Sequence, residues 1–173
     1  MNKLTTEHTP DNIIASWLDD HQEELVHTAD YIFHHPELAY QETLSSKCLA
    51  DYLESQGFKI TWKTAGIDTS FTAVWGSGKP LLGFLAEYDA LAGVGHACGH
   101  NLLGVASIGA VIGIKAELEA KKLSGTVVYY GCPGEEVLTG KAFMARNGAF
   151  RDIDLAFSWH GSATTTITDG VIT

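Results

Sequence analysis

The sequence predicts a layered α/β fold with a largely parallel central sheet. Two observations lead to this prediction. Short segments with strand-like patterns alternate along the chain with segments whose apolar residues have helical spacing. The predicted helices lie between successive strands, as crossover connections of parallel strands require. The chain has 173 residues, 45% of them hydrophobic. It is therefore long and apolar enough for about one domain with a real core.

The first part of the chain is predicted to be helical. Thr9 is suited to the N-cap and Pro10 to the first position of a helix. Apolar residues then recur at helical spacing, and this pattern predicts one helix that Pro36 ends. A second helix is predicted over 40–56, with Gly57 just after its last turn.

Strands and helices alternate along the rest of the chain. Phe58, Ile60 and Trp62 alternate with polar residues, as in a half-buried strand, and Gly76 begins a turn-like segment. Several small residues in the long helix are expected to let it lie close on the sheet. The predicted strands are 58–62, 70–75, 81–86, 126–131 and 153–159, and the predicted helices between them are 101–121 and 138–147.

Charge and composition exclude several classes of partner. A formal charge of −10 and a pI near 5.1 disfavour nucleic acids and anionic membranes. No apolar run approaches the ~20 residues of a membrane span. The first 20 residues lack the basic-then-apolar order of a signal peptide. We therefore expect a cytoplasmic protein, in which the three cysteines do not form a disulfide framework.

Acids, imidazoles and a thiol gather where the predicted strands end. Ligands bind at the carboxyl ends of strands in open α/β sheets, so these groups are expected to converge. Several acids cannot share one partly buried spot without compensation, and a divalent cation removes the conflict. A metal site is therefore predicted. Cys98, at a predicted helix start, is expected to be a thiolate. The junctions are 87–89, 96–100, 132–136 and 159–160.

Five motifs in this order carry a resemblance to a known family. The set resembles the metallopeptidases that include aminoacylases, carboxypeptidase G and indole-acetyl-amino-acid hydrolases, and looks most like the branch of the aminobenzoyl-glutamate hydrolase B subunit. The resemblance covers about residues 12–162. The motifs are His35-Pro36-Glu37-Leu38, Glu87-Tyr88-Asp89-Ala90-Leu91, His96-Ala97-Cys98-Gly99-His100-Asn101, Cys132-Pro133-Gly134-Glu135-Glu136 and Trp159-His160.

The resemblance implies a fold and a domain organisation. The fold is the three-layer α/β/α catalytic domain of zinc exopeptidases, and residues 12–162 correspond to its N-terminal part. Residues 1–11 are expected to be a polar tail. Residues 163–173 are expected to begin the connection to a lid and dimerisation domain that this chain lacks. The full-length members of the family are homodimers.

The resemblance also implies site residues. It implies a site for two divalent metal ions, either Zn or Mn/Co. Glu135 matches the general base that takes a proton from the attacking water, and Asp89 matches the acid that orients a group bound to the metal. Glu87 and Asn101 depart from the residues common in the family and lie outside the expected ligand set. The implied metal ligands are Cys98, His100, Glu136 and His160.

The expected function is that of a metal-dependent amidohydrolase or peptidase. Its substrate would be a small-molecule amide or a dipeptide, such as an N-acyl amino acid or aminobenzoyl-glutamate, cleaved by metal-activated water. The alternative is a truncated, inactive metal-binding fragment, or one chain of a split enzyme. A third reading is a mononuclear zinc protein with a redox-active Cys98.

Other cysteines and histidines have simpler interpretations. Cys48 and Cys132 are predicted to be packing residues, because free cysteines are often buried. His34 and His35 lie just before a proline at a helix end, where they are predicted to bind the last helical carbonyls. His96 is left out of the site because the neighbouring glycines predict a loop.

Overall fold

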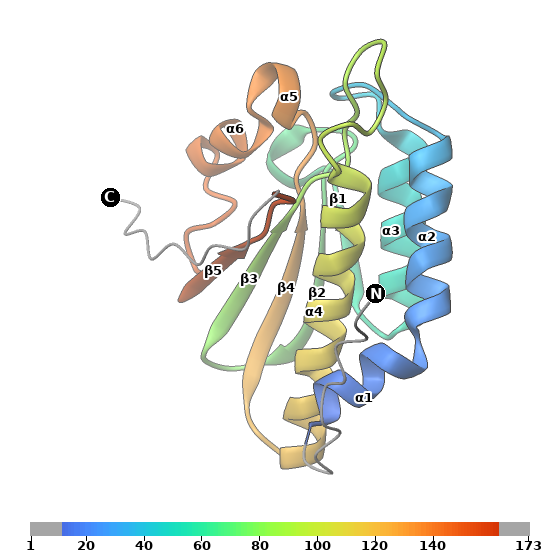
Figure 1. Ribbon diagram of the computed structural model, residues 1–173. Helices are drawn as coiled ribbons and strands as arrows, with labels where there is room; N and C mark the ends of the chain where they lie inside the picture. The colour runs from blue at the N-terminus through green and yellow to red at the C-terminus, as the bar shows by residue number, and fades with distance from the viewer. Residues whose placement is uncertain (1–11, 163–173) are drawn as a thin grey trace.

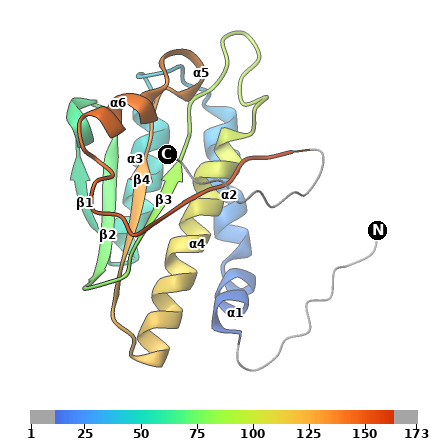
Figure 2. The same cartoon turned by 90° about the vertical axis from the view of Figure 1, so that its left-hand side faces the viewer.

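The computed structural model describes residues 12–162 and contains a five-stranded sheet (Figure 1). The strands lie in the order β1-β2-β4-β3-β5. Helices α1 to α4 lie on one side of this sheet, and α6 lies on the other (Figure 2). The strands are β1 (Lys59–Trp62), β2 (Phe71–Ser77), β3 (Leu81–Ala86), β4 (Gly125–Gly131) and β5 (Leu155–Ser158).

Four of the five strands point the same way. β3 pairs in parallel with β4 and β5, whereas β2 is antiparallel to both β1 and β4. A short connection joins β1 to β2, which permits antiparallel pairing, and a long helical crossover joins β3 to β4, as parallel pairing requires. The predicted α/β fold is confirmed, with β2 as the reversed strand.

The main core lies between the sheet and the first four helices. α3 and α4 cover the sheet, while α2 packs on α3 and α4, and α1 packs on α4. Fully buried residues of this core include Leu53, Phe71, Ile108 and Tyr129. The helices are α1 (Ile13–Asp20), α2 (Gln22–His34), α3 (Thr43–Ser55) and α4 (His100–Lys121).

A smaller core lies on the opposite face of the sheet. Met144 of α6 packs there with Val128 and Tyr130 of β4, and Cys132 is fully buried beside them, as predicted. This core brings α6 over the end of the sheet where β3 and β4 finish (Figure 1). The short helices involved are η1 (Thr64–Gly66), α5 (Glu135–Leu138) and α6 (Gly140–Arg146).

The prediction of one N-terminal helix is wrong, because the chain breaks between α1 and α2 at His21. The His21 ring stacks on Trp17, and its Nδ1 lies 2.8 Å from the Trp17 carbonyl oxygen, so His21 caps α1. Asn12 caps the start of α1 by accepting the amide of Ala15. The predicted helix start at Thr9 and Pro10 falls outside the described residues.

Side chains also cap the end of α2 and the start of α3. Nδ1 of His34 and of His35 lies 2.7 Å from a carbonyl oxygen one turn earlier, which agrees with their predicted capping role. Helix α3 begins three residues later than predicted because the Glu37 carboxylate binds its first turn. Glu37 accepts the amides of Leu44 and Ser45 at 2.9 and 2.8 Å.

One helix was predicted over 138–147, but the structure has two short helices, α5 and α6, in this part of the chain. Thr139 has φ 50°, a left-handed conformation that separates α5 from α6. Gly140 then approaches Pro133 so closely that a Cβ atom at this position would lie 1.8 Å from the Pro133 carbonyl oxygen. Only glycine allows this reversal, which folds the segment between β4 and α6 into a compact loop.

Small residues in α4 make room for other helices as well as for the sheet. Gly109 faces Leu18 and Gly113 faces Ile14, so the expectation that these residues serve the sheet contact is wrong for both. They let α1 approach instead. Helix α4 also corrects the expectation about apolar runs, because it is long and apolar enough to cross a membrane by composition alone. More than half of that stretch is buried within the fold.

The buried carboxylate of Glu42 connects three segments that surround the end of the sheet. Glu42 precedes α3 and is fully buried. Its Oε1 accepts the Gly134 amide at 2.8 Å, and its Oε2 accepts the Thr69 hydroxyl at 2.9 Å. Burial is the largest influence on this group and raises the pKa of Glu42. Glu42 therefore holds the loop after β4 in place at the cost of burying its own charge.

Two substitutions of Glu42 separate the stabilisation by its hydrogen bonds from the destabilisation by its buried charge. Glu42→Ala leaves the buried Gly134 amide unpaired and opens a cavity, so it should lower the free energy of unfolding by about 2–4 kcal/mol. Glu42→Gln keeps an acceptor and removes the buried charge, so it should cost about 1 kcal/mol or less. Urea unfolding measures both, with exposed Glu54→Ala as the control. Equal losses for Ala and Gln would contradict this account.

Candidate metal centre

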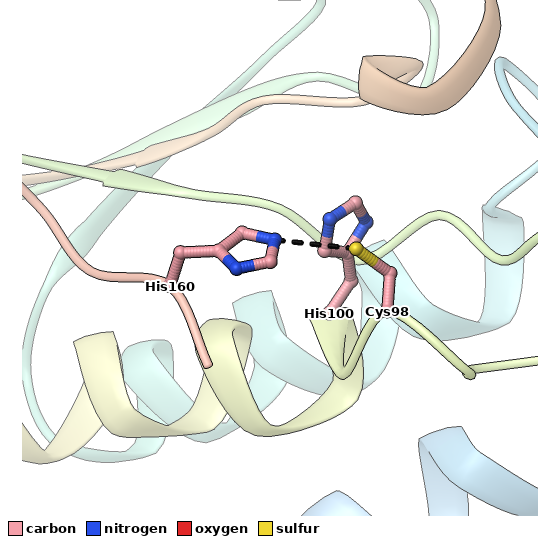
Figure 3. Close-up of side chains that lie close together, drawn as sticks. All are labelled: Cys98, His100 and His160. Atoms are coloured by element: carbon pink, nitrogen blue, oxygen red, sulfur yellow. Dashed lines mark hydrogen bonds between the residues drawn. The ribbon is translucent and has the colours of Figure 1, made fainter. Parts of the chain in front are cut away.

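The structure brings the predicted site residues together at one end of the sheet. Asp89 follows β3, and His100 begins α4 two residues after Cys98. Glu135 and Glu136 begin α5 after β4, and His160 follows β5. Each residue thus comes from the carboxyl end of a parallel strand or from the helix start beside it. Figure 3 shows three of them, Cys98, His100 and His160, side by side.

His100 is fully buried and oriented by Asp89. Its Nδ1 lies 3.0 Å from the backbone oxygen of Asp89 and 3.0 Å from Oδ1 of the same residue. Both Asp89 atoms are acceptors, so Nδ1 must carry a hydrogen and donate it. The other ring nitrogen, Nε2, is then the one available to a metal when the imidazole is neutral.

Asp89 also fixes the segment that carries the acid pair. It is 1% exposed, and its Oδ2 accepts the backbone amide of Glu136 at 2.9 Å. One carboxylate therefore sets the ring orientation of His100 and the position of Glu136. This geometry supports the orienting role expected for Asp89.

Three buried donor atoms around His100 lack hydrogen-bond partners. They are Nε2 of His100, Oε1 of Glu136 and Oε2 of Glu87. Nε2 lies 3.8 Å from the Glu136 oxygen and 3.0 Å from the Glu87 oxygen. Ligands about 2.0–2.3 Å from one tetrahedral ion lie roughly 3.3–3.8 Å apart. The separation of Nε2 from the Glu136 oxygen falls in this range, and its separation from the Glu87 oxygen is slightly shorter. Buried polar atoms without partners are rare, and a divalent cation would satisfy all three.

A thiol and a second imidazole extend this group of donors. Sγ of Cys98 lies 3.2 Å from Nε2 of His160, and the His160 ring meets the His100 ring edge to face with centroids 5.7 Å apart (Figure 3). The donor atoms of Cys98, His100 and His160 all lie within 4.8 Å of one another. Thiolate and imidazole donors together are typical of zinc and of other transition metals.

The expectation that Cys98 is a thiolate by itself is wrong. Burial, followed by the Glu136 and Glu135 carboxylates, raises the pKa of the Cys98 thiol to about 11. Helix α4 begins only at His100, so Cys98 precedes the turn where the helix dipole acts, and the nearby acids outweigh that dipole. A cation bound between these groups would reverse the balance and favour the thiolate.

Carboxylates of the site also act on His100. Burial disfavours the imidazolium ion, but the carboxylates of Asp89 and Glu87 outweigh burial and raise the pKa of His100 to about 10. Burial likewise opposes the charge on Glu87, yet His100 and Lys141 hold the pKa of its carboxyl below the usual value. Negative charge thus dominates the site, and it attracts any available cation.

Two residues of this site lie outside the set of catalytic and metal-binding residues that the motifs imply. Glu87 lies two positions before Asp89, and with His100 and Glu135 it forms a second group of donor atoms within 4.8 Å. Lys141 of α6 forms an ion pair with Glu87. The position of Glu87 at a strand end predicted that it would converge on the site, whereas no local pattern singles out Lys141. His96 is buried and belongs to neither of the two donor groups.

Comparisons with known proteins agree with this picture. No family model matches the chain. The B subunit of p-aminobenzoyl-glutamate hydrolase from Escherichia coli K12 is 45% identical over an alignment of 152 residues, and the match covers 78% of this chain and 32% of that protein. The human Xaa-Arg dipeptidase is 35% identical over an alignment of 164 residues, and the match covers 86% of this chain and 38% of that protein. The chain thus spans about a third of the length of these curated relatives.

Solved structures show the same fold. The Bacillus subtilis YXEP protein, described as a dinuclear metal binding peptidase from the M20 family, superposes with a TM-score of 0.69 at 23% identity. The match covers 83% of this chain and 44% of that one. An aminobenzoyl-glutamate utilization protein from Klebsiella pneumoniae gives a TM-score of 0.67 at 16% identity, with the same coverage of 83% and 44%.

The resemblance predicted from the five motifs is therefore confirmed. Relatives at 35–45% identity carry names of amide-bond hydrolases, and the solved structures show the fold of M20 catalytic domains. Over the region that it covers, the chain is a homologue of these amide-bond hydrolases, and it has the fold of an M20 peptidase catalytic domain.

Proposed function

We propose that this chain forms the metal-binding part of an amidohydrolase or peptidase that cleaves amide bonds with activated water. The observation that carries the proposal is the convergence of three buried, unpartnered donor atoms, on His100, Glu136 and Glu87, beside the pair of Cys98 and His160. Such an arrangement is costly in a folded protein unless a cation completes it.

The proposed ligands are Cys98, His100, Glu136 and His160. A divalent cation held there would lower the pKa of water and polarise the amide carbonyl. Other residues of the chain orient the ligands and transfer protons. Asp89 keeps the Nδ1 hydrogen of His100 in place, so that Nε2 faces the cation.

The neighbouring acids differ in exposure, which supports different roles. The Glu136 side chain is 15% exposed, and its backbone amide is fixed by Asp89. The Glu135 side chain is 38% exposed, with Oε2 4.0 Å from His100 Nε2. The buried acid is suited to bind the cation. The more exposed acid can reach a water molecule, accept its proton and return the proton to the leaving amine.

The charges in the site support two cations rather than one. When ionised, Glu87, Asp89, Glu135 and Glu136 carry four negative charges, and a Cys98 thiolate adds a fifth. One divalent ion would leave three of these unbalanced, whereas two ions leave one. The mixed thiolate, imidazole and carboxylate donors are compatible with zinc, manganese or cobalt.

The proposed substrates are small molecules with an amide bond next to a carboxylate-bearing amino acid. The names of the relatives support this class: p-aminobenzoyl-glutamate hydrolase, Xaa-Arg dipeptidase and IAA-amino acid hydrolase. We also propose a cytoplasmic location, which is supported by three cysteines that are all free thiols.

A split enzyme, in which a second chain completes the site, is the other candidate. The aromatic residues of and after β5 favour it, because Phe157 is 43% exposed and Trp159 is 48% exposed at an edge of the sheet. Such apolar surface commonly marks a contact with another polypeptide. In that case this chain would bind metal alone and hydrolyse amides only with its partner.

Metal content tests the proposed site directly. The reduced chain, dialysed against Zn²⁺, Mn²⁺ or Co²⁺ and analysed by mass spectrometry, should retain about one or two ions per chain. The double variant Cys98→Ala, Glu136→Ala should lose them because two donors are gone. The matched control Cys48→Ala, Glu119→Ala changes the same residue types away from the site and should retain them. Equal metal content in all three proteins would refute the site.

Glu135→Gln tests the division of labour between the two acids. The amide cannot accept a proton, so hydrolysis of p-aminobenzoyl-glutamate or an Xaa-Arg dipeptide should fall about 10²- to 10⁴-fold. Metal content should stay unchanged, because Glu135 is outside the proposed ligand set. Exposed Glu54→Gln serves as the control. The assay is run on the chain alone and on the chain with its partner polypeptide, and turnover that survives Glu135→Gln would rule out this base.

A further inference from the structure

Lys141 makes a contact that the proposed function does not use. It lies in the first turn of α6, and its ammonium group donates to Oε1 of Glu87. The side chain of Lys141 is 25% exposed and that of Glu87 is 6% exposed, so the pair is largely shielded from water. Among the described residues, this is the only ion pair between a lysine and an acid of the site.

The second oxygen of Glu87 points toward the metal donors. Oε2 lies 3.0 Å from Nε2 of His100, a contact that is an ion pair only when the ring is protonated, and neither buried atom has another hydrogen-bond partner. The two oxygens of Glu87 therefore have different surroundings. Lys141 holds one of them, and the other lies beside Nε2 of His100, the nitrogen available to a metal.

The net charge of the site indicates a role for Lys141. The acids of the site and the Cys98 thiolate exceed the charge of two divalent cations by one negative charge. The ammonium group of Lys141 supplies the missing positive charge at the most buried of the acids that face Nε2. A hydrogen bond from a neighbouring group is also the usual way in which a metal-binding carboxylate is oriented.

We propose that Glu87 is a further ligand of the metal centre and that Lys141 is its positioning residue. Lys141 fixes Oε1 so that Oε2 stays directed at the cation, and it neutralises the charge that two cations leave over. This inference rests on the proposed metal binding. It adds a carboxylate outside the ligand set implied by the motifs, together with a lysine from a helix that carries none of the other donors.

Cobalt titration tests the pair through a spectroscopic signal that does not depend on turnover. Co²⁺ is added to the full chain, and its visible and thiolate charge-transfer absorption is followed. Lys141→Met removes the charge but keeps the length of the side chain, so Co²⁺ affinity should fall about 10-fold, with an altered visible spectrum. Glu87→Gln should lower the affinity about 10- to 100-fold. Lys141→Arg should restore affinity and spectrum to nearly the wild-type values.

A double variant separates positioning from a general loss of charge. If Lys141 acts through Glu87, Glu87→Gln combined with Lys141→Met should bind Co²⁺ no more weakly than Glu87→Gln alone. Lys79→Met is the matched control, because Lys79 pairs with the exposed Asp154 and should leave affinity and spectrum unchanged. Urea unfolding of each variant confirms that it is folded.

The outcomes distinguish this inference from the proposed function. Wild-type affinity and spectrum in Lys141→Met, or fully additive losses in the double variant, would overturn the positioning role while metal binding stands. Wild-type affinity in folded Glu87→Gln would overturn the ligand role in the same way. A wild-type chain that takes up no Co²⁺ would overturn both the proposed function and this inference.

Discussion

The buried carboxylate of Asp89 is the interaction on which the site depends. It binds the ring of His100 at the start of α4 and the backbone amide of Glu136 at the start of α5. These two segments follow different strands, and one side chain fixes them relative to each other. With Nδ1 committed to Asp89, the Nε2 of His100 faces the buried carboxylates of Glu87 and Glu136, and in the neutral imidazole it is available to a cation. The proposed metal site depends on that constraint.

The surrounding fold keeps this arrangement rigid. Glu42 holds Gly134, and Gly140 allows the chain to turn back against Pro133, so the loop before and after the acid pair is anchored at two points. Each anchor has a cost, either a buried charge or a glycine that no other residue can replace. Proteins retain such costs where geometry must be exact to a fraction of an ångström, as it must be for metal ligands.

The sequence was sufficient to predict the α/β fold and the convergence of the motif residues, because strand ends meet at one edge of a sheet. Local breaks were not predictable from spacing: His21 ends α1 by stacking on Trp17, and Thr139 divides α5 from α6 through its backbone conformation. Contacts between residues far apart in the sequence were also not predictable from it. Lys141 and Glu87 are 54 positions apart, and only the packing of α6 on the sheet brings them together.

The most direct test of the account is the location of a bound metal, determined by anomalous diffraction from crystals of the chain grown with Zn²⁺. The account predicts an ion about 2.0–2.1 Å from Nε2 of His100, with Sγ of Cys98 about 2.3 Å from the same ion or from its neighbour. Nδ1 of His100 should still face Asp89. Zinc bound only at other residues, with Nε2 of His100 left without a metal, would contradict the account.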